Sequence, residues 1–171
     1  MNITLIGMPG SGKTSVGKEL AAMLDYKHID PDRLMEKKYA GLLQVILDKS
    51  GEERFLKKEE ETAISATKGK NNLVISPGGS IIYCPKAMEY FQEISTIFYL
   101  RTPLAVIEKR LGNVPRGIVG LKGKTLGCLF TERAPLYEKW AEVSIDANYG
   151  AKKVASGILE KLRSNHGAQR F

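Results

Sequence analysis

The residues with the most evident chemistry form the stretch Gly7-Met8-Pro9-Gly10-Ser11-Gly12-Lys13-Thr14. Its spacing, G-x-x-x-x-G-K-T, is that of a phosphate-binding loop. Glycines let the backbone turn tightly beside a phosphate, and the N–H groups at a helix N-terminus attract anions. We expect Lys13 to reach the outer phosphates of a nucleotide and the Thr14 hydroxyl to coordinate Mg²⁺. A plain glycine-rich turn is the disfavoured alternative, because both side chains stand at the required offsets.

Two carboxylates form a second candidate group, directly after an apolar stretch. Asp30 and Asp32 are one residue apart. We expect Asp30 to hold Mg²⁺ and Asp32 to orient an attacking hydroxyl or to accept its proton, as a kinase requires. The alternative for Asp32, a simple helix cap, stays open.

A third group consists of glycines and arginines. Gly78 and Gly79 follow an apolar run, so a small substrate can approach their backbone closely; an ordinary strand-to-helix turn is the alternative. Arg133 and Arg116 offer planar forks of donors for a carboxylate or phosphate, although a single arginine is often only a solvated surface residue. Arg116 lies in the glycine-rich stretch 112–127, which we expect to be a mobile lid over the transferred phosphate.

Alternating strands and helices must position these residues. Apolar runs predict strands near 3–6, 26–30, 73–76, 94–100 and 141–145. We expect the helix at 52–67 to face solvent, with Phe55, Leu56 and Ile64 turned inward. Ser50-Gly51 should interrupt the helical conformation before it. The fold class is therefore α/β: a three-layer α/β/α fold of the P-loop type with a parallel sheet of about five strands, in one domain over 1–171. Further helices are expected at 15–24, 32–36, 42–49, 103–111, 131–137 and 154–162.

Composition narrows the class of partner. The formal charge of +7 suits an anionic ligand such as a nucleotide. A nucleic-acid partner is disfavoured because Lys and Arg are spread along the chain rather than clustered. The two cysteines, Cys84 and Cys128, fit no metal or redox spacing. We find no charged leader and no apolar segment near 20 residues, so we expect a cytoplasmic monomer without a membrane partner.

Taken in order, these motifs resemble those of the shikimate kinase family of small P-loop kinases, over nearly the whole chain. The loop 7–14 is similar to the family's nucleotide-binding loop. Arg116 falls where the family has its lid arginine. The remaining matches are Asp30-Pro31-Asp32 to its D-x-D, Gly51-Glu52-Glu53-Arg54-Phe55 to its G-E-x-x-F, Pro77-Gly78-Gly79 to its glycine triplet, and Glu132-Arg133-Ala134-Pro135-Leu136-Tyr137 to its E-R-x-P-L-Y.

The resemblance implies phosphoryl transfer from ATP, with Mg²⁺, to a hydroxyl of a small carboxylate-bearing acceptor, with shikimate first among the candidates. It implies Lys13, Asp32 and Arg116 as catalytic residues and Thr14 and Asp30 as metal ligands. The implied acceptor-binding residues are Asp32, Gly78, Gly79 and Arg133. The implied nucleotide-binding residues are Gly10, Ser11, Gly12, Lys13, Thr14 and Ser15. Arg110 is added to them as an arginine suited to phosphate, a weaker candidate than Arg116 and Arg133.

Three departures from the family pattern keep the acceptor open. Leu56 stands where the family has a second carboxylate-binding arginine, Pro77 replaces the first glycine of the triplet, and Ile118-Val119 differs from the family's lid. Losing one arm of a carboxylate clamp costs roughly 1.5–3 kcal/mol. Another hydroxyl acceptor, such as a sugar acid, polyol or amino-acid-like molecule, is therefore an alternative. A nucleotide- or RNA-binding module without transfer activity is a more distant one, against which Asp32 argues.

Overall fold

The structure is a computed structural model that describes residues 1–112 and 117–167 of the chain. Within these ranges five strands form one parallel sheet in the order β2-β3-β1-β4-β5. The parallel α/β sheet predicted from the sequence is confirmed. The strands are β1 (Asn2–Ile6), β2 (Lys27–Ile29), β3 (Leu73–Ile75), β4 (Ser95–Arg101) and β5 (Val143–Asp146).

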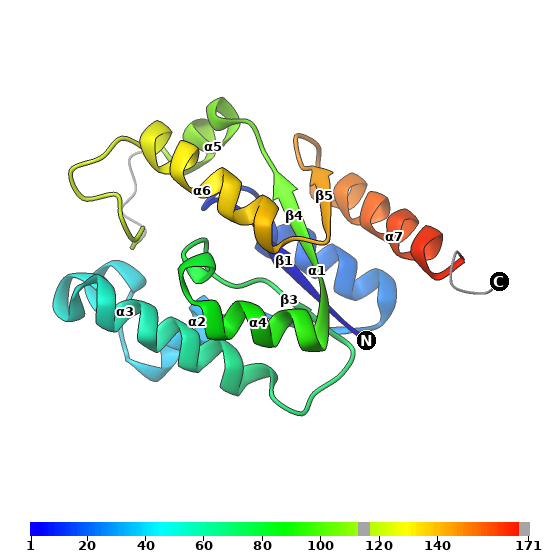
Figure 1. Cartoon of the computed structure of the whole chain (residues 1–171), viewed down its shortest axis with the longest axis horizontal. Coiled ribbons are helices and arrows are strands. Elements are labelled where there is room, and N and C mark those ends of the chain that lie inside the picture. The colour runs from blue at the N-terminus through cyan, green and yellow to red at the C-terminus, as the bar shows by residue number, and fades with distance from the viewer. Residues whose placement is uncertain (113–116, 168–171) are drawn as a thin grey trace.

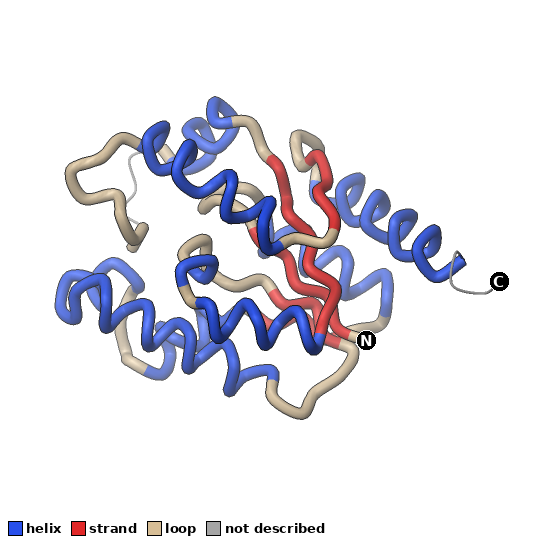
Figure 2. The backbone as a smooth tube through the Cα atoms, viewed as in Figure 1, coloured by secondary structure: helices blue, strands red, loops and turns tan. Residues whose placement is uncertain are grey.

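Helices cover both faces of this sheet (Figures 1 and 2). One face packs against α1 (Lys13–Leu24) and α7 (Ala151–Gly167) in a single apolar cluster. The other face carries the remaining helices, so the predicted three layers are present. Those helices are α2 (Pro31–Lys38), α3 (Leu43–Thr67), the short 3₁₀ helix η1 (Ile81–Tyr83), α4 (Pro85–Ile94), α5 (Leu104–Leu111) and α6 (Leu126–Trp140).

The central strand β1 shows why residues 3–6 form a largely apolar run in the sequence. All residues of β1 are buried. Ile3 and Leu5 pack toward α1 and α7, whereas Ile6 packs into the cluster on the opposite face. Successive side chains of a strand point to opposite faces, so a strand covered on both sides is apolar at consecutive positions.

The strand register brings the candidate segments to one edge of the sheet. Ile29 of β2 pairs with Ile75 of β3, and β3 pairs with β1 in the same direction. Asp30 and Ser76 therefore follow neighbouring strand ends, next to the loop that follows Ile6. Parallel α/β sheets bind their ligands at this carboxyl edge.

The helices agree with the prediction at the break in α3 and differ from it in three respects. Gly51 has φ 74° and ψ 165° inside α3, so the predicted break is confirmed although helix continues on both sides. The prediction that 52–67 faces solvent is wrong at Glu59, which is buried. Helix α4 was not anticipated, and α6 begins at Leu126 rather than at 131. None of the helices in the described residues is long and apolar enough to cross a membrane.

Candidate active site

The loop between β1 and α1 has the conformation that its glycines predict. Gly10 and Gly12 have φ values of 80° and 96°, in the left-handed region that favours glycine. Gly12 is the N-cap of α1 and supplies no side chain there, which leaves room for an anion at the helix N-terminus. Lys13 folds back over the loop, and its Nζ donates to the carbonyl oxygens of Gly7 at 2.8 Å and Met8 at 3.0 Å. The result is an anion-binding turn with an ammonium group beside it.

Two cations flank this loop. Burial lowers the pKa of Lys13 to about 8. The charge of Asp32 acts in the opposite direction but is the smaller effect. Arg110 on α5 donates from Nη1 to the carbonyl oxygen of Gly10 at 3.2 Å. A positive charge on each side suits a polyphosphate.

Thr14 and Asp30 lie together, as expected for a shared metal ion. The Thr14 hydroxyl donates to Asp30 Oδ2 at 3.1 Å. The other oxygen of Asp30 accepts the N–H of Arg33 at 3.2 Å, so Asp30 is the N-cap of α2, with Pro31 in the first turn. The open alternative of Asp32 as the cap is therefore wrong. A hydroxyl and a carboxylate oxygen fit Mg²⁺, which completes its shell with phosphate and water.

A carboxylate pair, Asp32 and Glu59, flanks Gly78. A Cβ at position 78 would collide with oxygens of both carboxylates, so a larger residue there would displace Asp32 and Glu59 from these positions. Oε2 of Glu59 accepts the Ser80 hydroxyl at 2.7 Å, and its buried Oε1 has no partner among the described residues. Burial and the charge of Asp30 raise the pKa of Asp32 to about 7; burial and the charge of Asp32 raise that of Glu59 to about 8. The pair therefore holds a proton near neutral pH.

Arg133 on α6 is fully buried, which is rare for an arginine. Its Nη2 donates to the carbonyl oxygen of Val119 at 2.7 Å, and its Nε donates to the Tyr83 hydroxyl at 3.4 Å. Its Nη1 is buried and has no partner among the described residues. A guanidinium with one unpaired arm binds an anion such as a carboxylate.

Leu56 confirms the departure from a two-arginine clamp. Its side chain packs against the apolar clusters of α3 and its neighbours. Arg54 and Lys57 on either side are exposed, so neither takes the place of an arginine at position 56.

One cavity of about 570 Å³ brings most predicted site residues together. Arg116 lies outside the described residues, and Ser11 and Asp30 lie behind the lining. We call one end the phosphate side, lined by Gly10, Gly12, Lys13, Thr14, Ser15 and Arg110, and the other the acceptor side, lined by Asp32, Glu59, Gly78, Gly79, Ser80 and Arg133.

Glu59 and Tyr83 are among the polar residues at this site that the sequence interpretation missed. Glu59 lies four residues after Phe55 and four before Ala63, both buried, so helical spacing places it on the inner stripe of α3. Its position within a Glu- and Lys-rich stretch hid this signal. Tyr83 belongs to no motif, and its contact with Arg133 arises only from the tertiary packing of η1 against α6.

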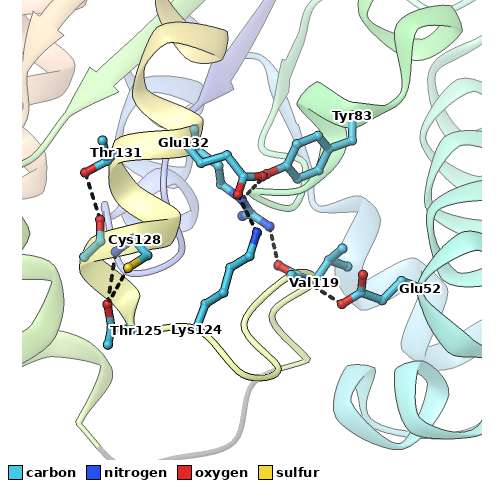
Figure 3. A network of polar contacts seen from close by, with 11 residues as sticks. Glu52, Tyr83, Val119, Lys124, Thr125, Cys128, Thr131 and Glu132 are labelled. Carbon is cyan, nitrogen blue, oxygen red and sulfur yellow. Dashed lines mark hydrogen bonds and ion pairs between the residues drawn. The ribbon is translucent and has the colours of Figure 1, made fainter.

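The loop 117–125 is tied to the helices around it (Figure 3). The N–H of Gly120 donates to Glu52 of α3 at 2.7 Å, and the N–H of Gly117 donates to Gln44 at 2.9 Å. At its other end Lys124 pairs with Glu132 of α6 at 2.7 Å. The loop therefore bridges α3 and α6 beside the acceptor side.

Comparisons with a family model, with relatives and with solved structures all find similarity to shikimate kinases. The family model described as shikimate kinase matches residues 9–163. The chain is 35% identical to a shikimate kinase of Francisella tularensis subsp. novicida, covering 94% of this chain and 92% of that protein. It is 32% identical to one of Nitrosomonas europaea, covering 96% and 80%. The fold matches that of a shikimate kinase from Acinetobacter baumannii in complex with shikimate, with a TM-score of 0.89 and 31% identity, over 96% of this chain and 93% of that one.

Proposed function

The chain belongs to the shikimate kinase family of ATP-dependent kinases, and from that premise we propose that it transfers the γ-phosphoryl group of Mg²⁺–ATP to a hydroxyl of shikimate. The observation that carries this proposal is the buried guanidinium of Arg133, which lines the cavity with one unpaired arm. A buried charge of this kind is stabilised when a carboxylate enters beside it. Shikimate supplies both that carboxylate and the hydroxyl to be phosphorylated.

On the phosphate side, the backbone N–H groups of residues 10–15 bind the phosphates of ATP. Lys13 exchanges its carbonyl partners for the β- and γ-phosphates, and Arg110 adds positive charge at the mouth of the loop. Thr14 and Asp30 hold Mg²⁺, which neutralises phosphate charge when bound.

On the acceptor side, Arg133 anchors the carboxylate and the Gly78-Gly79 backbone lies against the ring. Asp32 orients the hydroxyl and accepts its proton as the oxygen bonds to the γ-phosphorus, while the bond from that phosphorus to the departing ADP oxygen breaks. A carboxylate whose pKa is about 7 suits a base at neutral pH. Arg116, outside the described residues, is proposed to neutralise the transferring phosphoryl group.

The proposal is tested by measuring ADP release from ATP with the purified chain and a panel of acceptors. We expect release to depend on shikimate and to yield one phosphate ester per ADP. Turnover of a sugar acid, polyol or hydroxy amino acid with none of shikimate would contradict the acceptor while leaving the kinase chemistry in place.

A different hydroxy acid is the second candidate acceptor, and Leu56 is the observation that favours it. Leu56 packs against apolar clusters and is not part of the cavity lining, and the neighbouring cations Arg54 and Lys57 are exposed. An acceptor that needs one cation beside its carboxylate would suit this arrangement better than one held by two arginines.

We also propose a single kinase domain that acts as a cytoplasmic monomer with no nucleic-acid or membrane partner. The spread of Lys and Arg along the sequence supports the absence of a nucleic-acid site. Gel filtration and a gel shift with RNA test these points: a dimer peak would contradict the monomer, and salt-sensitive RNA binding would contradict the absence of a nucleic-acid partner.

A further inference from the structure

Tyr83 lies against the guanidinium of Arg133. It is the last residue of η1, which follows the Gly78-Gly79 turn of the cavity wall. Its ring centroid is 5.1 Å from the guanidinium carbon, and its hydroxyl oxygen accepts the Nε–H of Arg133 at 3.4 Å. Tyr83 thus contacts the arginine both through its ring face and through its oxygen.

A chain of polar contacts holds Tyr83 in turn (Figure 3). The Tyr83 hydroxyl donates to Glu132 Oε1 at 2.5 Å. The other oxygen of Glu132 accepts from Lys124 Nζ at 2.7 Å. Because the phenol proton is directed to Glu132, a lone pair of the Tyr83 oxygen is left for Arg133.

The loop 117–125 meets this chain at two points. Lys124 contacts Glu132, and the carbonyl oxygen of Val119 accepts Arg133 Nη2 at 2.7 Å. Two of the three nitrogens of the guanidinium are therefore held, by Tyr83 and by Val119. The third, Nη1, is the one that remains unpaired among the described residues.

We propose that Tyr83 is a positioning residue that fixes the guanidinium of Arg133 so that Nη1 meets the acceptor carboxylate, and that Glu132 and Lys124 fix Tyr83. This inference rests on the proposed role of Arg133 as the carboxylate anchor. Within the described residues, Arg133 is the guanidinium that lines the acceptor side, and Arg54 and Lys57 on either side of Leu56 are exposed. Orienting a binding group before the ligand arrives lowers the entropic cost of binding.

The protonation states agree with this direction of hydrogen bonding. Burial and the bond to Glu132 raise the pKa of Tyr83, so the phenol stays neutral. Hydrogen bonds from Lys124 and Tyr83 lower the pKa of Glu132, so the acceptor in that bond is a carboxylate. Among the described residues, the titratable groups that face the phenol are the anion Glu132, the cations Arg133 and Lys124, and the phenol of Tyr137.

Tyr83→Phe removes the hydroxyl and keeps the ring. The hydrogen bond from Arg133 to Tyr83 is long, at 3.4 Å, so its loss predicts the effect of an ordinary hydrogen bond: a roughly three- to tenfold rise in KM for shikimate, with kcat and KM for ATP within about twofold of wild type. Tyr90→Phe removes a partly buried phenol from α4 and is the matched control, expected to leave both KM values unchanged. Glu132→Gln should raise KM for shikimate less than Tyr83→Phe does, and Lys124→Ala less again, because both side chains are about half exposed.

A second measurement needs no acceptor. The Nε–H resonance of Arg133, assigned by its loss in Arg133→Lys, should be protected from solvent exchange in ¹⁵N NMR spectra of the unliganded protein. We expect Tyr83→Phe to move this resonance and speed its exchange, and Tyr90→Phe to leave it in place. An unchanged resonance in Tyr83→Phe, or a KM for shikimate equal to that of wild type, would overturn the positioning role. If the wild type does not phosphorylate shikimate, the proposed acceptor fails while the NMR result still decides the role of Tyr83.

Discussion

The phosphate side of the cavity comes from one continuous stretch of chain with Arg110 of α5 added to it, whereas the acceptor side is assembled entirely from distant elements. Residues 7–15 supply the turn, the lysine and the hydroxyl of the phosphate side. The acceptor side takes Asp32 from α2, Glu59 from α3 and Arg133 from α6, with Gly78 between strand and helix. One side is thus determined by local backbone conformation and the other by tertiary packing.

The two sides also differ in how their polar groups are paired. Lys13 and Arg110 donate to carbonyl oxygens of the phosphate loop itself. On the acceptor side, Glu59 Oε1 and Arg133 Nη1 have no partner among the residues that the structure describes. Buried polar atoms without partners are costly. The cations of the phosphate side are therefore paired within the loop, where the Ser11 hydroxyl is the buried atom left without a partner among the described residues. On the acceptor side the unpaired atoms belong to charged groups, which a substrate can pair.

The largest expected effect is that of Asp32→Asn. If Asp32 accepts the hydroxyl proton, its loss lowers kcat by roughly 10²–10⁴-fold, as for other general bases. The wild-type rate should fall as pH drops through about 7, because Asp32 becomes protonated there and cannot accept a proton. The variant should lack this limb in a pH profile of kcat/KM. Turnover close to wild type would show that Asp32 is not the base.

Arg133→Lys should affect binding on the acceptor side of the cavity and leave binding on the phosphate side nearly unchanged. A lysine keeps the charge but loses the planar fork, so KM for shikimate should rise roughly 10- to 100-fold, as for 1.5–3 kcal/mol of a charged hydrogen bond. KM for ATP should change by less than about twofold. Steady-state kinetics with each substrate varied in turn checks this, and equal increases in both KM values would break the separation.

Leu56→Arg should strengthen the binding of shikimate on the acceptor side. A second guanidinium near the carboxylate would lower KM for shikimate by about tenfold, from at least 1.5 kcal/mol of added interaction. Leu56→Gln has a similar polar reach without the charge and should not lower KM. A KM for shikimate that rises in Leu56→Arg would show that a guanidinium at this position does not help to bind the carboxylate.

The smallest expected effect is on stability. The folded chain keeps Glu59 protonated up to about pH 8, whereas the unfolded chain releases this proton near its ordinary pKa of 4.5. The folded state binds more protons across this window, so its stability falls as pH rises from about 4.5 to about 8. Glu59→Gln removes that loss and should melt a few degrees above wild type at pH 8.5, since 1 kcal/mol corresponds to roughly 2–4 °C at this size.

The exposed residue Glu61 provides the control for this experiment. Glu61→Gln should show the same dependence of melting temperature on pH as wild type. A melting temperature of Glu59→Gln that falls in parallel with wild type between pH 5 and 8.5 would show that Glu59 is not the source of the dependence.

The conformation of the loop 7–14 could be predicted from the sequence because it depends on local spacing, as the positive φ of Gly10 and Gly12 shows. The break at Gly51 in α3 follows from a local rule in the same way. The acceptor side was predicted where a motif marked it, as at Asp32 and Arg133. It was missed at Glu59 and Tyr83, where burial depends on which helix packs against which, and no local pattern carries that information.

The most direct test of the account is a titration of shikimate into the purified chain with Mg²⁺–ADP present, repeated with Arg133→Lys. We predict saturable binding to wild type at one site per chain and binding weakened roughly 10- to 100-fold in the variant, with binding of Mg²⁺–ADP unchanged. Equal binding of shikimate to both proteins, or no binding to wild type while Mg²⁺–ADP still binds, would contradict a carboxylate acceptor anchored by Arg133.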